Sequence, residues 1–149
     1  MRITQETDYA LRMIDYLSCS EEEVVGASTL SEELKIPIRF ALKILRKLNI
    51  YGITKALRGV NGGYYLNKKP QDINYKMVVE AIEGEIYINK RLQDPACCSR
   101  NMVGSECPIN NNLRKIQDKG ITYADETLYI AKFLEEKGIT VSGIVISRY

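Results

Sequence analysis

The chain has 149 residues, of which 27% are charged, and its formal net charge is only +2, the composition of a single globular domain or of one small domain with an appendage. It contains no histidine, which excludes His-dependent catalytic triads and His-ligated zinc sites and makes an enzyme a poor candidate. Its charge is segregated, because residues 34–71 hold nine Lys or Arg and no Asp or Glu, whereas the rest of the chain is net acidic. Such a segment is typical of a surface that meets a polyanion.

The first part of the chain is predicted to form three helices. Residues 4–18 carry apolar side chains at i, i+3, i+4 and i+7, the spacing of one buried helix face, and Cys19 is expected to be a small core residue at the end of this helix. After a polar loop over 21–26, Ser28 is a suitable N-cap for a second helix that runs to about residue 35. Ile36-Pro37 breaks the chain, because proline restricts the residue before it. A third helix is expected over about 38–49.

A hairpin and more helices follow. Short strands are predicted over 53–57 and 64–66, around a turn that contains Asn61-Gly62, a strong hairpin signal. A fourth helix is predicted over 72–83, with Ile73, Met77, Ala81 and Ile82 on one side. A loop over 86–108 holds three of the four cysteines. Two further helical stretches are marked by apolar residues from Ile109 and from Ala124, and the tail 139–149 is expected to be a strand or a docking arm.

Two helices with a tight break, followed by a hairpin with a basic tip, are the element order of a winged helix-turn-helix. The predicted fold class is therefore mainly α with a small β-hairpin wing. Arg39, Lys43 and Arg46 lie at i, i+4 and i+7, so all three can point into a major groove. The glycines beside Arg58 allow a close backbone approach to DNA. The candidate DNA-binding residues are Ser28, Arg39, Phe40, Lys43, Arg46, Lys47, Arg58, Asn61, Gly62, Gly63 and Tyr64.

Two alternatives to DNA binding have a physical basis. A basic helix face can be merely solvated, and a hairpin can merely connect two elements. The hairpin, the helix break and the absence of acidic residues together favour DNA. RNA fits less well, because the major groove of A-form RNA does not admit a helix.

The sequence resembles the IscR/NsrR/CymR-type winged-helix transcription regulators. The resemblance rests on the opening residues 1–12, on Ile36-Pro37, on residues 44–48, on Arg58-Gly-Val-Asn-Gly-Gly-Tyr64 and on Ala81-Ile-Glu-Gly84. It implies a homodimeric, cytoplasmic bacterial regulator, typically a repressor, that binds a pseudo-palindromic operator. It also implies a DNA-binding domain over 1–84, a cysteine-containing sensor loop over 85–108, and dimerisation helices with a C-terminal tail over 109–149.

The same resemblance makes the cysteine loop a candidate iron–sulfur site, because several members hold a cluster with three cysteines there. The candidate ligands are Cys97, Cys98, Cys107 and Asp8, the last matching an aspartate that ligates from the other subunit. This chain departs from the pattern, with Arg91 where the first cysteine is expected and Asn110 where the IscR type has a ligand. Three alternatives follow: a cluster regulator that responds to redox state, nitric oxide or iron–sulfur status; a cluster-free regulator controlled by thiol oxidation, a small effector or a metabolic-enzyme partner; and cysteines without a sensing role. Arg91 is expected to lower the pKa of a nearby thiol, which would favour the redox alternative.

Overall fold

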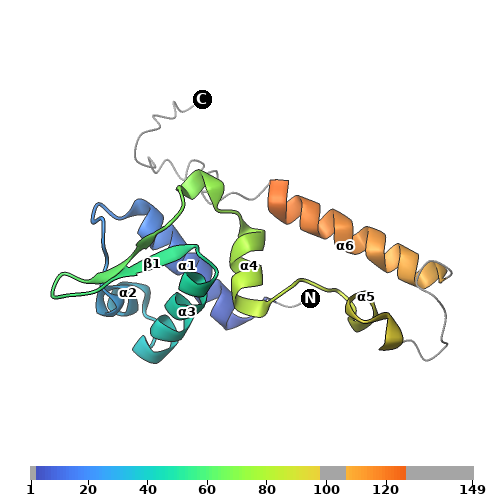
Figure 1. Ribbon diagram of the computed structural model, residues 1–149, viewed down its shortest axis with the longest axis horizontal. Coiled ribbons are helices and arrows are strands. Elements are labelled where there is room, and N and C mark those ends of the chain that lie inside the picture. The colour runs from blue at the N-terminus through green and yellow to red at the C-terminus, as the bar shows by residue number, and fades with distance from the viewer. Residues whose placement is uncertain (1–2, 98–106, 127–149) are drawn as a thin grey trace.

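The computed structural model describes residues 3–97 and 107–126. In this part of the chain, four helices and a hairpin form one packed unit, and a long helix extends from its side (Figure 1). The bounds of the main elements are α1 Gln5–Cys19, α2 Ala27–Leu34, α3 Ile38–Ile50, β1 Thr54–Leu57, β2 Gly63–Leu66, α4 Tyr75–Glu83, α5 Lys90–Gln93 and α6 Pro108–Glu126. The element order confirms the predicted mainly α fold with a small hairpin.

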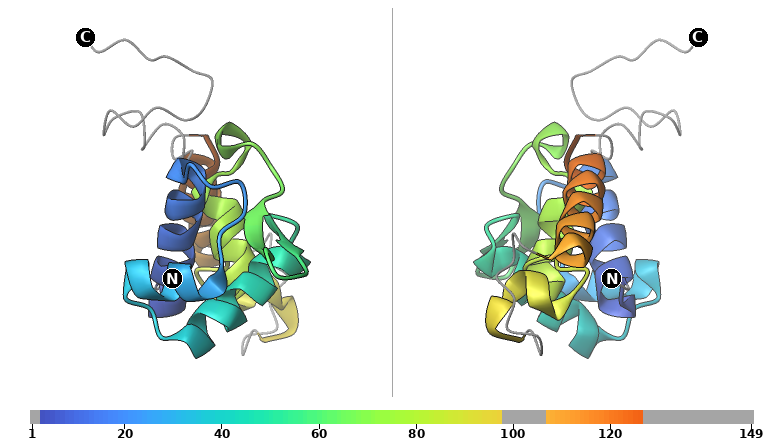
Figure 2. Two further views of the ribbon diagram at one scale, coloured as in Figure 1. Left: turned by 90° about the vertical axis from the view of Figure 1, so that its left-hand side faces the viewer. Right: turned by 90° about the vertical axis from the view of Figure 1, so that its right-hand side faces the viewer.

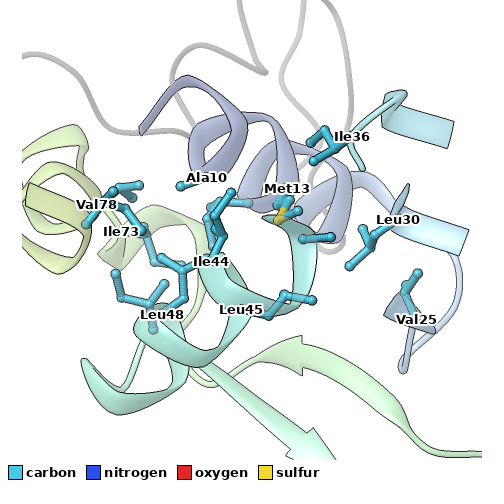
Figure 3. Packing of buried hydrophobic residues seen from close by; sticks show 14 residues of the cluster. Ala10, Met13, Val25, Leu30, Ile36, Ile44, Leu45, Leu48, Ile73 and Val78 are labelled. Carbon is cyan, nitrogen blue, oxygen red and sulfur yellow. The ribbon is translucent and has the colours of Figure 1, made fainter. Parts of the chain in front are cut away.

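The core lies between α1, α2, α3 and α4. Helices α1 and α3 contribute the apolar faces that their spacing predicted, with Ala10, Met13 and Ile14 from α1 and Ile44, Leu45 and Leu48 from α3 fully buried (Figure 3). Local chemistry sets the helix starts: the side chain of Thr4 accepts a hydrogen bond from the Thr7 N–H, and Asn74 accepts one from Met77 at the start of α4.

The break between α2 and α3 has the tight geometry of a helix-turn-helix. Lys35 adopts a left-handed conformation with φ 55°, Ile36 is buried, and Pro37 occupies the N-cap of α3. The Ser31 hydroxyl donates to the Ile36 carbonyl, which holds the turn against the end of α2. The predicted N-cap at Ser28 was wrong: α2 begins at Ala27, with Gly26 at the N-cap, because Val25 is anchored to the hairpin.

The hairpin forms where it was predicted, and its second strand begins one residue earlier than expected, at Gly63. Leu57 pairs with Gly63, which leaves residues 58–62 as the loop, and the turn is closed by a hydrogen bond of 3.0 Å from the Gly62 N–H to the Gly59 carbonyl. Gly59 takes a positive φ of 119°. Val25, predicted to lie in a polar loop, forms an antiparallel bridge with Tyr64 and so adds a short third segment beside β2.

The later elements also differ from the sequence predictions. Helix α4 begins at Tyr75 and not at Asp72, because Pro70–Asp72 form a 3-10 turn, and its buried face is Val78, Val79 and Ile82. The predicted loop 86–108 contains α5 and a 3-10 turn over Pro95–Cys97. Helix α6 is continuous from Pro108 to Glu126, so the two predicted stretches are joined at Ala124. The remainder of the second stretch and the tail 139–149 lie outside the described residues.

Candidate nucleic-acid interface and cysteine segment

Helix α3 and the hairpin lie on one side of the molecule, and α6 lies on the other (Figure 1; Figure 2, left). The buried face of α3 consists of Ala41, Ile44, Leu45 and Leu48. Arg39 and Arg46 are exposed on the opposite side of α3. Phe40 on α3 and Ser28 on α2 are also exposed. The fold therefore presents Arg39 and Arg46 of α3 to solvent, on the same side of the molecule as a hairpin whose loop carries exposed Arg58 and Asn61.

The other two cations of α3 have partners within the protein. Nζ of Lys43 lies 3.0 Å from one carboxylate oxygen of Glu6 on α1, and Nζ of Lys47 lies 2.8 Å from the other. Lys47 also donates to the Ile82 carbonyl at 2.9 Å, near the end of α4. Burial raises the pKa of Glu6, but the hydrogen bonds from Lys47 and Lys43 outweigh it, and the pKa lies below its ordinary value. Lys47 therefore serves to join α1, α3 and α4.

The glycines of the hairpin have a packing reason that the sequence did not indicate. A Cβ on Gly63 would lie 2.5 Å from the Val25 carbonyl oxygen, and a Cβ on Gly62 would lie 2.5 Å from that of Leu57. Gly63 allows Val25 and the next residue, Tyr64, to exchange backbone hydrogen bonds of 2.8 and 2.9 Å. The half-buried Tyr64 is thus a structural residue of the hairpin, and Gly62 and Gly63 shape the loop that carries Arg58.

Cys107 lies at the entrance to α6 and is buried. Nη1 of Arg91 on α5 lies 3.4 Å from its Sγ. The backbone N–H of Asn110 is the main cause that lowers the pKa of the Cys107 thiol; burial opposes it, and Arg91 and the N–H of Ile109 lower it further. The expectation that Arg91 lowers a thiol pKa is confirmed for this cysteine.

The other candidate ligands have different surroundings. The exposed Cys97 thiol donates to Asp94, and this hydrogen bond raises the pKa of Cys97. Asp8 forms an ion pair of 2.7 Å with Arg12. Cys98 lies outside the described residues. Cys19 is exposed, so its prediction as a core residue was wrong: the last turn of α1 extends beyond the core.

An iron–sulfur cluster requires several ligands, mostly thiolates, that converge on one point. In the part of the chain that the structure describes, no three Cys, Asp or Glu side chains gather closely enough to hold a metal ion. Cys107, Cys97 and Asp8 are each engaged with a protein group, which is the Arg91 guanidinium, the Asp94 carboxylate and the Arg12 guanidinium, respectively. The described side chains therefore do not fit a cluster.

Two residues of the site escaped the sequence analysis. Glu6 contacts the basic helix from a distant place in the chain, and Val25 supports the hairpin from a loop that looked merely polar. No local sequence pattern predicts the Glu6 contact, because it depends on how α1 packs against α3.

Among the described helices, none is both long and apolar enough to cross a membrane.

Comparison with known proteins gives a consistent result. The model of the Rrf2 family, described as "Iron-dependent Transcriptional regulator", matches residues 3–135. The HTH-type transcriptional regulator NsrR of Shouchella clausii is 27% identical over 106 residues, which are 65% of this chain and 71% of that protein. The fold is similar to T. potens IscR, with a TM-score of 0.67 and 16% identity over 99% of this chain and 94% of that one. It is also similar to the oxidized form of Staphylococcus aureus CymR, with a TM-score of 0.62 and 19% identity over 99% and 100%.

Proposed function

Because the chain belongs to the Rrf2 family of transcriptional regulators, we propose that it is a homodimeric regulator that binds a pseudo-palindromic operator in double-stranded DNA and acts as a repressor. In this proposal residues 1–84 bind DNA, residues 85–108 sense the signal, and residues 109–149 hold the dimer. Two observations carry it together: Arg39 and Arg46 on α3 are exposed, and α3 lies on the same side of the molecule as the hairpin.

This arrangement matches how a winged helix-turn-helix meets DNA. The outward side of α3 enters the major groove, where arginine pairs with guanine in a bidentate manner. The hairpin loop reaches the neighbouring DNA backbone or minor groove. Where the minor groove is narrow, its negative potential attracts the Arg58 guanidinium. Lys43 reaches phosphate by exchanging its Glu6 partner, and Lys47 stays within the protein.

The dimer is supported by α6, which presents two large apolar side chains to solvent. Ile109 is 66% exposed and Ile116 is 60% exposed, and their separation of seven residues places them on one side of the helix. A two-fold partner that packs on this side would bury both pairs of isoleucines at once. The same symmetry would place two copies of α3 about one DNA turn apart.

The test uses a fluorescent duplex enriched by the wild-type protein from a randomised pool. Replacing Arg58 with Ala is expected to weaken binding by about 1–3 kcal/mol. Arg114→Ala on α6 is the matched control, because it removes the same charge from the other side of the molecule. An unchanged affinity for Arg58→Ala would remove the hairpin from the interface, and a failure to enrich any duplex would reject the proposed function.

For the sensing step, the contact between Arg91 and Cys107 favours the cluster-free alternative. A thiolate held by a guanidinium at the start of α6 is positioned to alter that helix when it is modified. One structurally similar protein, S. aureus CymR, was solved in an oxidized form. Anaerobic purification followed by iron and sulfide assays tests this choice. Stoichiometric iron and sulfide would favour the cluster alternative, whereas an iron-free protein that binds DNA would favour control by thiol oxidation, a small effector or a metabolic-enzyme partner.

A further inference from the structure

Helix α3 carries an exposed apolar pair on its outward side. Leu42 is 45% exposed and Ile38 is 43% exposed, although the helix already buries four other apolar side chains in the core. The two residues are four positions apart and so lie on one ridge of the helix, and Arg46 continues the same ridge one turn later. Neither residue is needed to complete the core.

The surroundings of this pair indicate what it meets. Arg46 follows Leu42 one turn later on this ridge, and Arg39, seven positions before Arg46, lies on the same side of the helix, so cations lie next to the apolar pair. No Asp, Glu, Gln, Ser or Thr occurs in α3, and its one Asn is in the last turn. The first ten residues of the helix therefore offer DNA two kinds of outward group, cationic and apolar.

Each kind of group has its counterpart in the major groove. Arg and Lys pair with guanine or phosphate, and the apolar feature of a base edge is the C5-methyl group of thymine. A helix without carboxylates in this region has no acceptor for the cytosine amino group, and without an early Asn or Gln it has no bidentate partner for adenine. We propose that Ile38 and Leu42 recognise thymine methyl groups, so that each operator half-site contains thymines beside the guanine or phosphate met by Arg39 or Arg46. This proposal rests on the proposed DNA-binding function.

Helix geometry restricts where those thymines lie. Residues four positions apart are separated by about 6 Å along the helix axis. Successive bases on one strand are separated by about 3.4 Å. For a helix that follows the groove, the methyl groups met by Ile38 and Leu42 therefore lie within about two base pairs of each other. Each half-site is therefore expected to contain two contacted thymines at this short spacing.

The test removes single methyl groups from DNA and leaves every hydrogen-bonding group of the base in place. The probe is the duplex enriched from the randomised pool, synthesised again with one thymine at a time replaced by uracil. At a contacted position, the affinity of the wild-type protein is expected to fall about fourfold, the value of one buried methyl group. At other positions it is expected to remain unchanged.

Protein variants connect the effect to the two side chains. At one of the positions where uracil weakens binding of the wild-type protein, Leu42→Ala should bind the thymine and uracil probes with equal affinity. Ile38→Ala should do the same at a second such position. Each comparison is a double-mutant cycle that measures the coupling between one side chain and one methyl group. Ile50→Ala is the matched control, because Ile50 is an exposed apolar residue in the last turn of the same helix. It should keep the full sensitivity to uracil.

The outcomes separate the two proposals. If the wild-type protein binds the enriched duplex but no uracil substitution weakens binding, the thymine inference is wrong and the proposed function stands. If the Leu42 and Ile38 variants lose affinity equally for both probes, the pair has no methyl-reading role. If no duplex is enriched at all, the proposed function itself fails. Thermal unfolding of each variant, followed by circular dichroism, shows whether a loss of binding reflects a loss of fold.

Discussion

Nζ of Lys43 on α3 lies 3.0 Å from the carboxylate of Glu6 on α1, although Lys43 belongs to a segment of 38 residues without any acidic side chain. The first helix supplies the acid that this segment lacks. The same carboxylate binds Lys47, so that Glu6 neutralises part of the cationic side of α3 in the free protein. In the proposed complex with DNA, phosphates would compete with Glu6 for Lys43.

Replacing Glu6 with Gln is expected to strengthen binding to the enriched duplex and to make it more dependent on salt. In the wild-type complex the phosphate gained by Lys43 is offset by the loss of its Glu6 partner, whose freed carboxylate attracts a cation from solution. Without that offset, the slope of log affinity against log salt should become steeper by about one unit. The free energy of unfolding should fall by about 0.5–1 kcal/mol, because the lost ion pairs are partly exposed. Fluorescence anisotropy at several salt concentrations measures the first effect, and urea unfolding measures the second.

The control for this prediction is Glu21→Gln, which removes an exposed carboxylate from the loop after α1. It should leave the salt slope near that of the wild-type protein. An equal slope for both variants would mean that Lys43 does not exchange Glu6 for phosphate.

Gly63→Ala is expected to destabilise the protein by about 1–3 kcal/mol, the usual cost of overpacking. The added Cβ would lie 2.5 Å from the Val25 carbonyl oxygen, and backbone atoms cannot rotate away as a flexible side chain would. Urea unfolding measures the effect. Gly26→Ala is a suitable comparison, because a Cβ there would meet only side-chain atoms at 3.6 Å. Equal stability of the two variants would contradict the packing role of Gly63.

Arg91→Ala is expected to raise the pKa of the Cys107 thiol, because the guanidinium contact that favours the thiolate is lost. Thiolate absorbance as a function of pH measures this, in a background in which Cys19, Cys97 and Cys98 are replaced by Ser. Because the pKa of Cys107 is lowered in the folded protein, its contribution to stability is present above the pKa of the unfolded chain and is lost as the pH falls through the folded value.

The comparison variant for Arg91 is Lys90→Ala, which removes a neighbouring exposed cation of the same short helix. It should leave the titration of Cys107 close to that of the wild-type protein. A shift as large as that of Arg91→Ala would show that the general field, and not the direct contact, sets the thiol pKa.

Ile116→Glu is expected to weaken the dimer at least tenfold, because burying an unpaired carboxylate costs several kcal/mol. Sedimentation at a series of protein concentrations gives the dissociation constant. Arg114→Glu introduces a larger change of charge, but it lies on a different side of α6 from Ile109 and Ile116, and it should leave the dimer intact. Dimers of unchanged strength in Ile116→Glu would place the interface elsewhere.

The sequence by itself determined the fold class, because local signals carried it. Apolar spacing identified the buried faces of α1 and α3, Pro37 marked the helix-turn-helix break, and the glycine-rich turn marked the hairpin. Segregation of charge then pointed to a polyanion. Each of these signals depends only on residues that are close together in the chain, so it can be recognised in a single sequence.

Only the tertiary structure decided which charged and thiol groups are available. Glu6 reaches Lys43 and Lys47, Arg91 reaches Cys107, and Val25 anchors Tyr64, and each of these contacts joins residues that are far apart in the sequence. Local spacing places Lys43, Arg46 and Lys47 alike on the polar side of α3, yet folding brings Glu6 and the Ile82 carbonyl to Lys47 and leaves Arg46 exposed. The helices surrounding a side chain determine its partner, and their packing is a property of the whole fold.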